Sequence, residues 1–144
     1  MNVRLIHSEE YPEASAVALK AFEQGVAPLY PAEGIETFYQ YAQPDAIQHR
    51  DSEGYITFVA KQDHIIIGML HARTAHLAML FVSPSHQKTG VAHNLIASAD
   101  KHSRLKTVNA SPNSVSVYEK LGFIIAGTTE QHKGMWVIPM RRNE

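Results

Sequence analysis

One segment, His76 to Asp100, constrains the fold of this chain more than any other. Its first part, residues 77–82, is an apolar run typical of a buried strand, and a Ser-Pro turn ends it. A short loop with one glycine follows, and then apolar residues recur at helical spacing at Val91, Ala92, Leu95, Ile96 and Ala99. A strand, a glycine-containing loop and a helix start can bind a pyrophosphate. The first N–H groups of a helix lack partners within it, and the helix dipole favours negative charge there.

The composition excludes several classes of function. With 144 residues, 44% of them hydrophobic and 19% charged, the chain is expected to form one globular domain spanning residues 1–144. The net charge is −1 and no Lys/Arg run is longer than Arg141-Arg142, which gives no electrostatic case for binding nucleic acid or an anionic membrane. The chain has no cysteine, so disulfides, thiolate zinc sites and a cysteine nucleophile are excluded, and any acyl transfer would have to be direct.

A metal site and a membrane span are not expected either. The nine histidines include no His-x-x-x-His pair, the spacing that places two ligands on one helix face. The longest apolar runs, 65–70 and 77–82, are far shorter than a membrane span, and the N-terminal residues lack the apolar core of a signal peptide. We therefore expect a soluble cytoplasmic protein without a metal.

Periodicity and turn residues predict the element order β-α-α-β-β-β-α-β-α-β-β. Ser8 is expected to cap the first helix, and the second, after a loop at 29–34, to end near Pro44. Ser111 is expected to cap the last helix, with Pro112 at its first position and Gly122 in the left-handed conformation that ends it. The predicted strands cover residues 3–6, 55–61, 65–73, 77–82, 105–109, 124–125 and 134–140.

Two sequence blocks resemble the GCN5-related N-acetyltransferase (GNAT) family. Gln87, Gly90 and Ala92 fill the three fixed places of its acetyl-CoA-binding motif, Gln/Arg-x-x-Gly-x-Gly/Ala. Residues 109–123 resemble the family's downstream helix, which an Asn opens, with a Tyr five residues later and a closing Leu-Gly-Phe. The blocks come in the family's order and spacing. Alanine replaces the third motif glycine, and Gln87 replaces the commoner arginine, which removes one charge from the phosphate site.

The resemblance implies an α/β (α+β) fold, a mixed central sheet flanked by helices, that binds acetyl-CoA between the motif strand and the strand after the motif helix. It also implies that the backbone around Leu80, Phe81 and Val82 pairs with the pantetheine arm, and that one of these amides polarises the acetyl carbonyl. The pyrophosphate would lie on the loop and helix start formed by Gln87, Lys88, Thr89, Gly90, Val91 and Ala92.

Two residues at the start of the downstream helix are further candidates for contacting the CoA arm. Asn113 matches the position whose side chain bonds that arm in many relatives, although Asn also caps helix starts well. Ser116 could reach a phosphate or simply face solvent.

Two side chains are candidates for the proton transfers. Tyr118 matches the tyrosine that relatives place near the sulfur, where its hydroxyl can donate to the leaving thiolate; otherwise it is a half-buried packing residue. His76 begins the motif strand, where some histone-modifying members carry a catalytic glutamate, and imidazole titrates in the right range for a general base. The alternative for His76 is a solvated strand-edge histidine.

The acceptor can be predicted only by its class. Glu33, Glu36 and Tyr39 lie in the region that usually builds the acceptor pocket; they suit a small cationic amine, or they only solvate a helix. The leading hypothesis is acetyl transfer from acetyl-CoA to a primary amine by direct attack in a ternary complex, in a monomer or homodimer. The alternatives are a non-catalytic CoA-binding or regulatory module, a protein-lysine or N-terminal acetyltransferase, and an interaction domain without a ligand.

Overall fold

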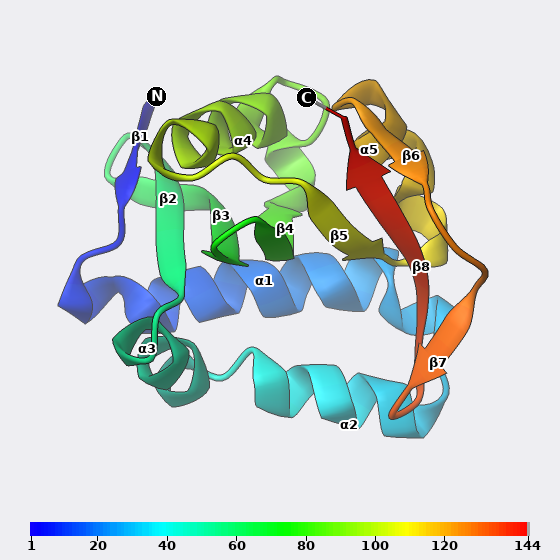
Figure 1. The fold of residues 1–144 in the computed structure, drawn as a ribbon. Helices are drawn as coiled ribbons and strands as arrows, with labels where there is room; N and C mark the ends of the chain where they lie inside the picture. The colour runs from blue at the N-terminus through cyan, green and yellow to red at the C-terminus, as the bar shows by residue number, and fades with distance from the viewer. Residues whose placement is uncertain (144) are drawn as a thin grey trace.

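A computed structural model describes residues 1–143, which form a mixed sheet flanked by helices (Figure 1). The helices are α1 (Tyr11–Gly25), α2 (Ala32–Tyr41), α3 (Pro44–Ser52), α4 (Val91–His102) and α5 (Val115–Lys120). The strands are β1 (Asn2–Leu5), β2 (Ile56–Gln62), β3 (Ile65–Arg73), β4 (His76–Val82), β5 (Thr107–Ala110), β6 (Phe123–Ile125), β7 (Glu130–His132) and β8 (Met135–Arg142). Their order is β1-β2-β3-β4-β5-β8-β6, with β7 pairing the first residues of β8. The pairing of β4 with β5 is parallel and the others are antiparallel.

Helices cover both faces of the sheet and bury two apolar layers (Figure 1). On one face α1, α2 and α3 contribute Phe22, Phe38 and Ile47 to a layer that also contains Met69 of β3. On the other face α4 and α5 pack their apolar residues against a second layer. The residues predicted for the apolar side of α4 include Leu95, which is fully buried there. Because successive strand residues point to opposite faces, the central strands serve both layers.

An extra residue in β4 marks the point where that strand leaves β5. Ala78 faces no residue of β3, so it forms a β-bulge. The parallel ladder with β5 stops beside it: the ladder joins residues 76–77 to residues 107–108 and includes no pair beyond them within the described chain. Bulges disrupt a ladder and redirect the side chains that follow. The two strands therefore part at Ala78, in the middle of the sheet.

Two elements were not predicted. The second helix ends before Pro44 as expected, but Pro44 then begins α3. Proline is tolerated in the first turn of a helix because its missing N–H would have no partner there. The strand β7 is three exposed polar residues, so it has no apolar alternation that the sequence could reveal. The loop predicted at 29–34 is also too long, since α2 begins at Ala32.

The predicted cap at Ser8 is wrong, and the one at Ser111 is correct in position only. Ser8 begins a 3-10 turn ahead of α1, and α1 itself starts at Tyr11. Ser111 is the N-cap residue of the 3-10 turn at 112–114, which leads into α5, and Pro112 lies in its first turn as predicted, but the Ser111 side chain makes no capping bond. The predicted end of the last helix is correct, since Gly122 follows α5 with a φ of +97°.

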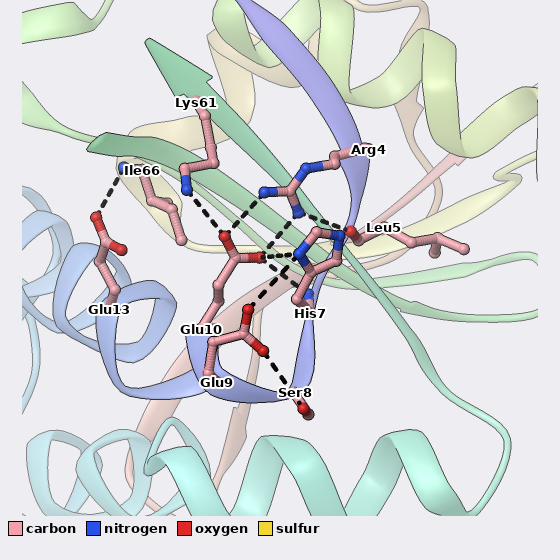
Figure 2. Close-up of polar contacts among 9 residues, drawn as sticks. All are labelled: Arg4, Leu5, His7, Ser8, Glu9, Glu10, Glu13, Lys61 and Ile66. Atoms are coloured by element: carbon pink, nitrogen blue, oxygen red, sulfur yellow. Dashed lines mark hydrogen bonds and ion pairs between the residues drawn. The ribbon is translucent and has the colours of Figure 1, made fainter. Parts of the chain in front are cut away.

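A buried carboxylate holds the start of α1 against the sheet, as Figure 2 shows. Glu10 accepts two bonds from the Arg4 guanidinium, at 2.8 and 2.9 Å, and one from Lys61 Nζ at 3.0 Å. The backbone N–H of His7 donates to the same carboxylate at 2.9 Å. The bonds from Arg4 hold the pKa of Glu10 well below its usual range. Glu10 thus joins β1 and β2 to the helix that supplies Phe22 to the region described next.

Candidate active site

A cleft of about 260 Å³ lies where β4 and β5 part. Residues 76–81 of β4 form one wall, and residues of β5, the β7–β8 hairpin and the α1–α2 region form the others. Its aromatic and imidazole side chains are Phe22, Tyr30, Phe38, Tyr41, Tyr55, Phe81, His76 and His132. The apolar end is firmly packed, because Phe22 stacks on Phe38 at 4.0 Å and Phe38 meets Phe81 edge to face at 5.3 Å. Of the three residues predicted for the pantetheine arm, Leu80 and Phe81 line this cleft, whereas Val82 does not line it and is buried in the apolar layer under α4 and α5.

The predicted phosphate loop has the geometry of an open helix start. Gly90 precedes α4 with a φ of +89°, and a side chain at this position would meet nothing within 4 Å. The first intrahelical bond at this end runs from the Asn94 N–H to the Gly90 carbonyl, so the earlier N–H groups make no bond within the helix. Lys88 also has a positive φ, +64°. This helix start can accept an anion on its N–H groups, with the Lys88 charge nearby.

The other side chains of that loop hold the loop itself. Gln87 Nε2 donates to the Val82 carbonyl at 3.0 Å, and the Thr89 hydroxyl donates to the His86 carbonyl. Val91, by contrast, buries its side chain in the core. Any contact between residues 87–92 and a phosphate would therefore come mainly from backbone.

Tyr118 lies in the apolar layer under α5, 7% exposed, with its ring edge-to-face against Phe123 at 5.7 Å. Its hydroxyl makes no hydrogen bond with residues 1–143. Burial raises its pKa well above the usual value, which keeps the proton on the oxygen at neutral pH. Tyr118 is not among the residues that line the cleft. Both the packing role and the proton-donor role are compatible with this position.

Asn113 and Ser116 are placed differently from one another. The Asn113 side chain donates to the Gly25 carbonyl at the end of α1, and it accepts from the Ser111 hydroxyl at 3.0 Å. It makes no side-chain cap, so the capping alternative for Asn113 is wrong. Ser116 is exposed on α5. In this conformation Asn113 ties α1 to the turn before α5.

His76 lines the cleft at the paired end of β4. Its Nδ1 lies 2.8 Å from the hydroxyl of Thr107 in β5. Burial lowers the pKa of His76, so the ring is neutral at pH 7 and is half-buried rather than fully solvated.

Two of the three residues predicted for the acceptor line a second, more open hollow beside α2. Glu33 and Glu36 lie there with Thr37, Gln40, Tyr41 and Lys133, around a volume of about 550 Å³. Glu36 accepts a bond from Gln40 at 2.8 Å. Tyr39 is exposed and lines neither the outer hollow nor the cleft. Tyr41 lines both, so the outer hollow adjoins the cleft.

Sequence reasoning missed the β7–β8 hairpin, which supplies His132, Met135 and Val137 to the cleft. Its two-residue turn, Lys133-Gly134, has φ values of +50° and +83°, as in the turns that suit β-hairpins. That Lys-Gly pair was the signal in the sequence, although it is weaker than Asn-Gly.

The hairpin turn is pressed against α2. A Cβ on Gly34 would lie 2.1 Å from the Gly134 carbonyl oxygen, and one on Gly134 would lie 2.4 Å from the Gly34 nitrogen. The Thr37 hydroxyl also donates to the Lys133 carbonyl at 2.8 Å, and the Tyr30 hydroxyl donates to the Trp136 carbonyl at 2.8 Å. A close approach of two backbones explains a glycine inside a helix, where it otherwise costs about 1 kcal/mol.

A buried polar network supports the tyrosines of the cleft. Arg50 Nε donates to His71 Nε2 at 3.0 Å, and since a guanidinium only donates, His71 is neutral with its proton on Nδ1. Nδ1 lies 2.9 Å from the Thr57 hydroxyl. Burial, with the nearby Arg50 charge, lowers the pKa of His71 to about 3. The His71 ring stacks on Tyr55 at 4.9 Å, and the Arg50 guanidinium lies 3.6 Å from the ring centroid of Tyr41.

Two kinds of feature are absent from residues 1–143. No three His, Asp or Glu side chains come together where they could hold a metal ion. Over the same residues, no helix has the length and apolar character needed to cross a membrane.

Comparison with known sequences gives one family. The sequence model of the acetyltransferase (GNAT) domain matches residues 26–144. No curated protein sequence matches the chain significantly.

Solved structures of acetyltransferases share the fold. A GCN5-related N-acetyltransferase from Rhodopseudomonas palustris superposes with a TM-score of 0.83 at 22% identity, covering 99% of this chain and 95% of that one. PaiA N-acetyltransferase from Thermoplasma acidophilum, solved in complex with coenzyme A, gives 0.74 at 19% identity, covering 99% and 100%. A ribosomal-protein-alanine N-acetyltransferase from Brucella melitensis gives 0.69 at 15% identity, covering 99% of each chain. At these identities the likeness shows the fold.

Proposed function

Because the chain belongs to the acetyltransferase (GNAT) domain family, we propose that it transfers an acetyl group from acetyl-CoA to a primary amine by direct attack in a ternary complex. The cleft at the parting of β4 and β5 carries this proposal. It exposes strand backbone beside an open helix start, so one extended ligand with a phosphate end could contact both. The complex of the Thermoplasma relative with coenzyme A is consistent with it.

The motif side of the cleft would bind the cosubstrate. The N–H groups at the start of α4, beside Gly90, would bind the pyrophosphate, and Lys88 would add a positive charge. The backbone around Leu80 to Val82 would pair with the pantetheine arm, and one of its amides would polarise the acetyl carbonyl. Asn113 would have to release Gly25 before it could bond the arm, and Ser116 is free to face a phosphate.

Tyr118 would donate a proton to the departing thiolate. A thiol has a reference pKa of about 8.5 and a phenol one of about 10, so the phenol donates only as charge builds on the sulfur. Its raised pKa keeps Tyr118 protonated until then. The acceptor ammonium must also lose a proton, and His76 is one candidate base because its neutral ring lines the cleft.

The acceptor would be a small metabolite amine that enters past α2. Glu33 and Glu36 give the outer hollow an acidic side that suits a cationic amine, and Tyr41 connects it to the cleft. A protein lysine or N-terminus is the alternative acceptor. We expect the enzyme to act in the cytoplasm, as a monomer or homodimer.

The first experiment measures cosubstrate binding and turnover. Acetyl-CoA at 100 times its dissociation constant should raise the free energy of unfolding by about 2.7 kcal/mol, which a melting curve resolves. Thiol release with a panel of primary amines then identifies turnover. Binding without turnover would favour a non-catalytic CoA-binding module, and no binding would exclude the proposed function.

A further inference from the structure

We propose that His132, oriented by Glu130, is the catalytic base that takes the proton from the acceptor amine, an inference that rests on the proposed acetyl transfer. Both residues belong to β7, in the hairpin that supplies His132, Met135 and Val137 to the cleft. His132 is one of two histidines that line the cleft, and neither the sequence motifs nor the family resemblance pointed to it.

The hairpin register turns Glu130 and His132 to the same face. His132 pairs with Met135 and Glu130 pairs with Val137. Directly paired cross-strand residues point to one face of a sheet, and Met135, Val137 and His132 all line the cleft. His132 Nε2 and Glu130 Oε1 are 2.8 Å apart, so the pair is bonded along the strand.

That bond determines which ring nitrogen can accept a proton. A carboxylate only accepts hydrogen bonds, so the neutral His132 ring must carry its hydrogen on Nε2 and its lone pair on Nδ1. When Nδ1 takes a proton, the Glu130 carboxylate stabilises the imidazolium that forms. A carboxylate bonded to the far nitrogen of a catalytic histidine has this role in hydrolases.

The other histidine of the cleft lacks such a partner. His76 is bonded through Nδ1 to the neutral hydroxyl of Thr107, and burial lowers its pKa, which makes it a weaker base than an ordinary imidazole. It also lies at the end of β4 that is still paired with β5, on the closed side of the strand parting. In this assignment His76 shapes the wall, and His132 does the proton transfer.

The reaction then balances as follows. The ammonium form of the acceptor loses one proton to make the attacking amine, the nitrogen–carbon bond forms, and the carbon–sulfur bond breaks with its electron pair left on sulfur. A proton also leaves the nitrogen as the amide forms. His132 Nδ1 carries protons from nitrogen to solvent, while the Tyr118 hydroxyl gives one to sulfur and regains it from solvent. The net products are the amide, the CoA thiol and one proton.

Other titratable groups also lie in or beside this cleft. Burial raises the pKa of Tyr30 to about 12 and raises that of Tyr41. The remaining titratable groups are Tyr55 and His76 in the cleft. Lys133, Glu33 and Glu36 lie in the adjoining hollow.

The test compares two nucleophiles that differ in their need for a base. At pH 7 an alkylamine is almost fully protonated, with a pKa of about 10.4 for a lysine-like amine, whereas hydroxylamine is largely unprotonated. We would measure kcat/KM for 1,4-diaminobutane and for hydroxylamine with wild type, His132→Gln, Glu130→Gln and His76→Asn. Both β7 side chains are about half exposed, so the hairpin variants should fold, which circular dichroism and the acetyl-CoA melting shift verify.

We expect His132→Gln to lose about 10²-fold or more with the alkylamine and less than about tenfold with hydroxylamine. Glu130→Gln should show a smaller loss of the same kind, and the double variant should be no worse than His132→Gln, because the two residues act as a unit. Equal losses with both nucleophiles, or an alkylamine-selective loss in His76→Asn alone, would overturn the proposal. If the wild type shows the acetyl-CoA melting shift and turns over the alkylamine, and His132→Gln keeps the same kcat/KM, only this inference is refuted. A wild type that neither binds acetyl-CoA nor releases thiol refutes the proposed function and this inference with it.

Discussion

The two sides of the cleft are built in different ways. The motif side consists of backbone: the bulge at Ala78, the strand edge beyond it and the helix start at Gly90. Its polar side chains, such as Gln87, bond the loop rather than the cleft. The hairpin side presents side chains, including His132 and Tyr41, on elements that lie about a hundred residues apart in the sequence.

This difference suits the two sides to different ligands: the backbone side to the cosubstrate and the side-chain side to the acceptor. A backbone site recognises features that every acyl-CoA shares, and it tolerates changes of side chain around it. A side-chain site changes with each substitution, so the hairpin side is where the acceptor would be selected. The contact of Gly34 with Gly134 is then as important as any motif residue, because it positions the whole hairpin side.

The largest loss of activity is expected at Tyr118. It is the one residue of the motif side whose side chain, rather than its backbone, would take part in the reaction. Tyr118→Phe keeps the ring and its contact with Phe123, but it removes the proton donor. We expect kcat to fall by about 10²–10⁴ while the acetyl-CoA melting shift is retained. Tyr39→Phe is the matched control, since Tyr39 lines neither hollow. An unchanged kcat in steady-state kinetics would assign Tyr118 to packing.

Next in size is the loss of cosubstrate binding in Gly90→Val. The side chain would occupy the space beside the helix start, so the stabilisation of about 2.7 kcal/mol at 100 times the dissociation constant should vanish. Gly54→Val is the control for backbone strain, because Gly54 has a φ of +108° and is equally open. It should melt lower but keep its acetyl-CoA shift. A full shift in Gly90→Val would mean that the loop is only a turn.

A smaller effect should follow from Gly34→Ala on the hairpin side. The new Cβ would clash with the Gly134 carbonyl and displace the hairpin from α2, at a cost of about 1–3 kcal/mol in unfolding free energy. The KM for the amine should rise while the acetyl-CoA shift persists. Gly25→Ala, also in a helix but with its nearest neighbour at 3.9 Å, should lose nothing. If both variants melt alike, the close approach of Gly34 to Gly134 does not hold the hairpin in place, and if Gly34→Ala loses the acetyl-CoA shift, the two sides of the cleft are not independent.

The smallest effect concerns pH. Because the pKa of His71 falls from 6.5 to about 3 on folding, the unfolded chain takes up its proton first as the pH drops below 6.5. The contribution of His71 to stability is therefore full above pH 6.5 and is lost toward pH 3, with a slope of at most about 1.4 kcal/mol per pH unit. Urea unfolding between pH 5 and 6.5 measures this slope of the unfolding free energy. The pH in this window is too high for Glu10 to take up a proton and contribute to the slope. His71→Gln should flatten the slope, and an unchanged slope would contradict this assignment.

The elements of the motif side were predictable from the sequence because the residues that form them are close together in the chain. Gly90 and the apolar period of α4 lie within a few residues of one another, and the strand ending at Val82 was predicted almost to its bounds. The hairpin side depends on contacts between distant residues. Gly34 was assigned to a loop, and only the approach of Gly134 explains why a glycine lies inside α2. His132 lies in three polar residues that show no strand pattern, so a cleft-lining side chain was missed.

The parting of β4 from β5 also leaves a length of unpaired strand edge within the sheet. Edges of this kind normally recruit other chains and promote aggregation. Here the edge lies in a cleft of about 260 Å³ between helices and a hairpin, which admits a slender extended ligand more readily than a second sheet. Such a ligand would serve as the missing strand. We therefore expect the amides of β4 to exchange hydrogen more slowly once acetyl-CoA binds, and the free protein to aggregate sooner than the bound one.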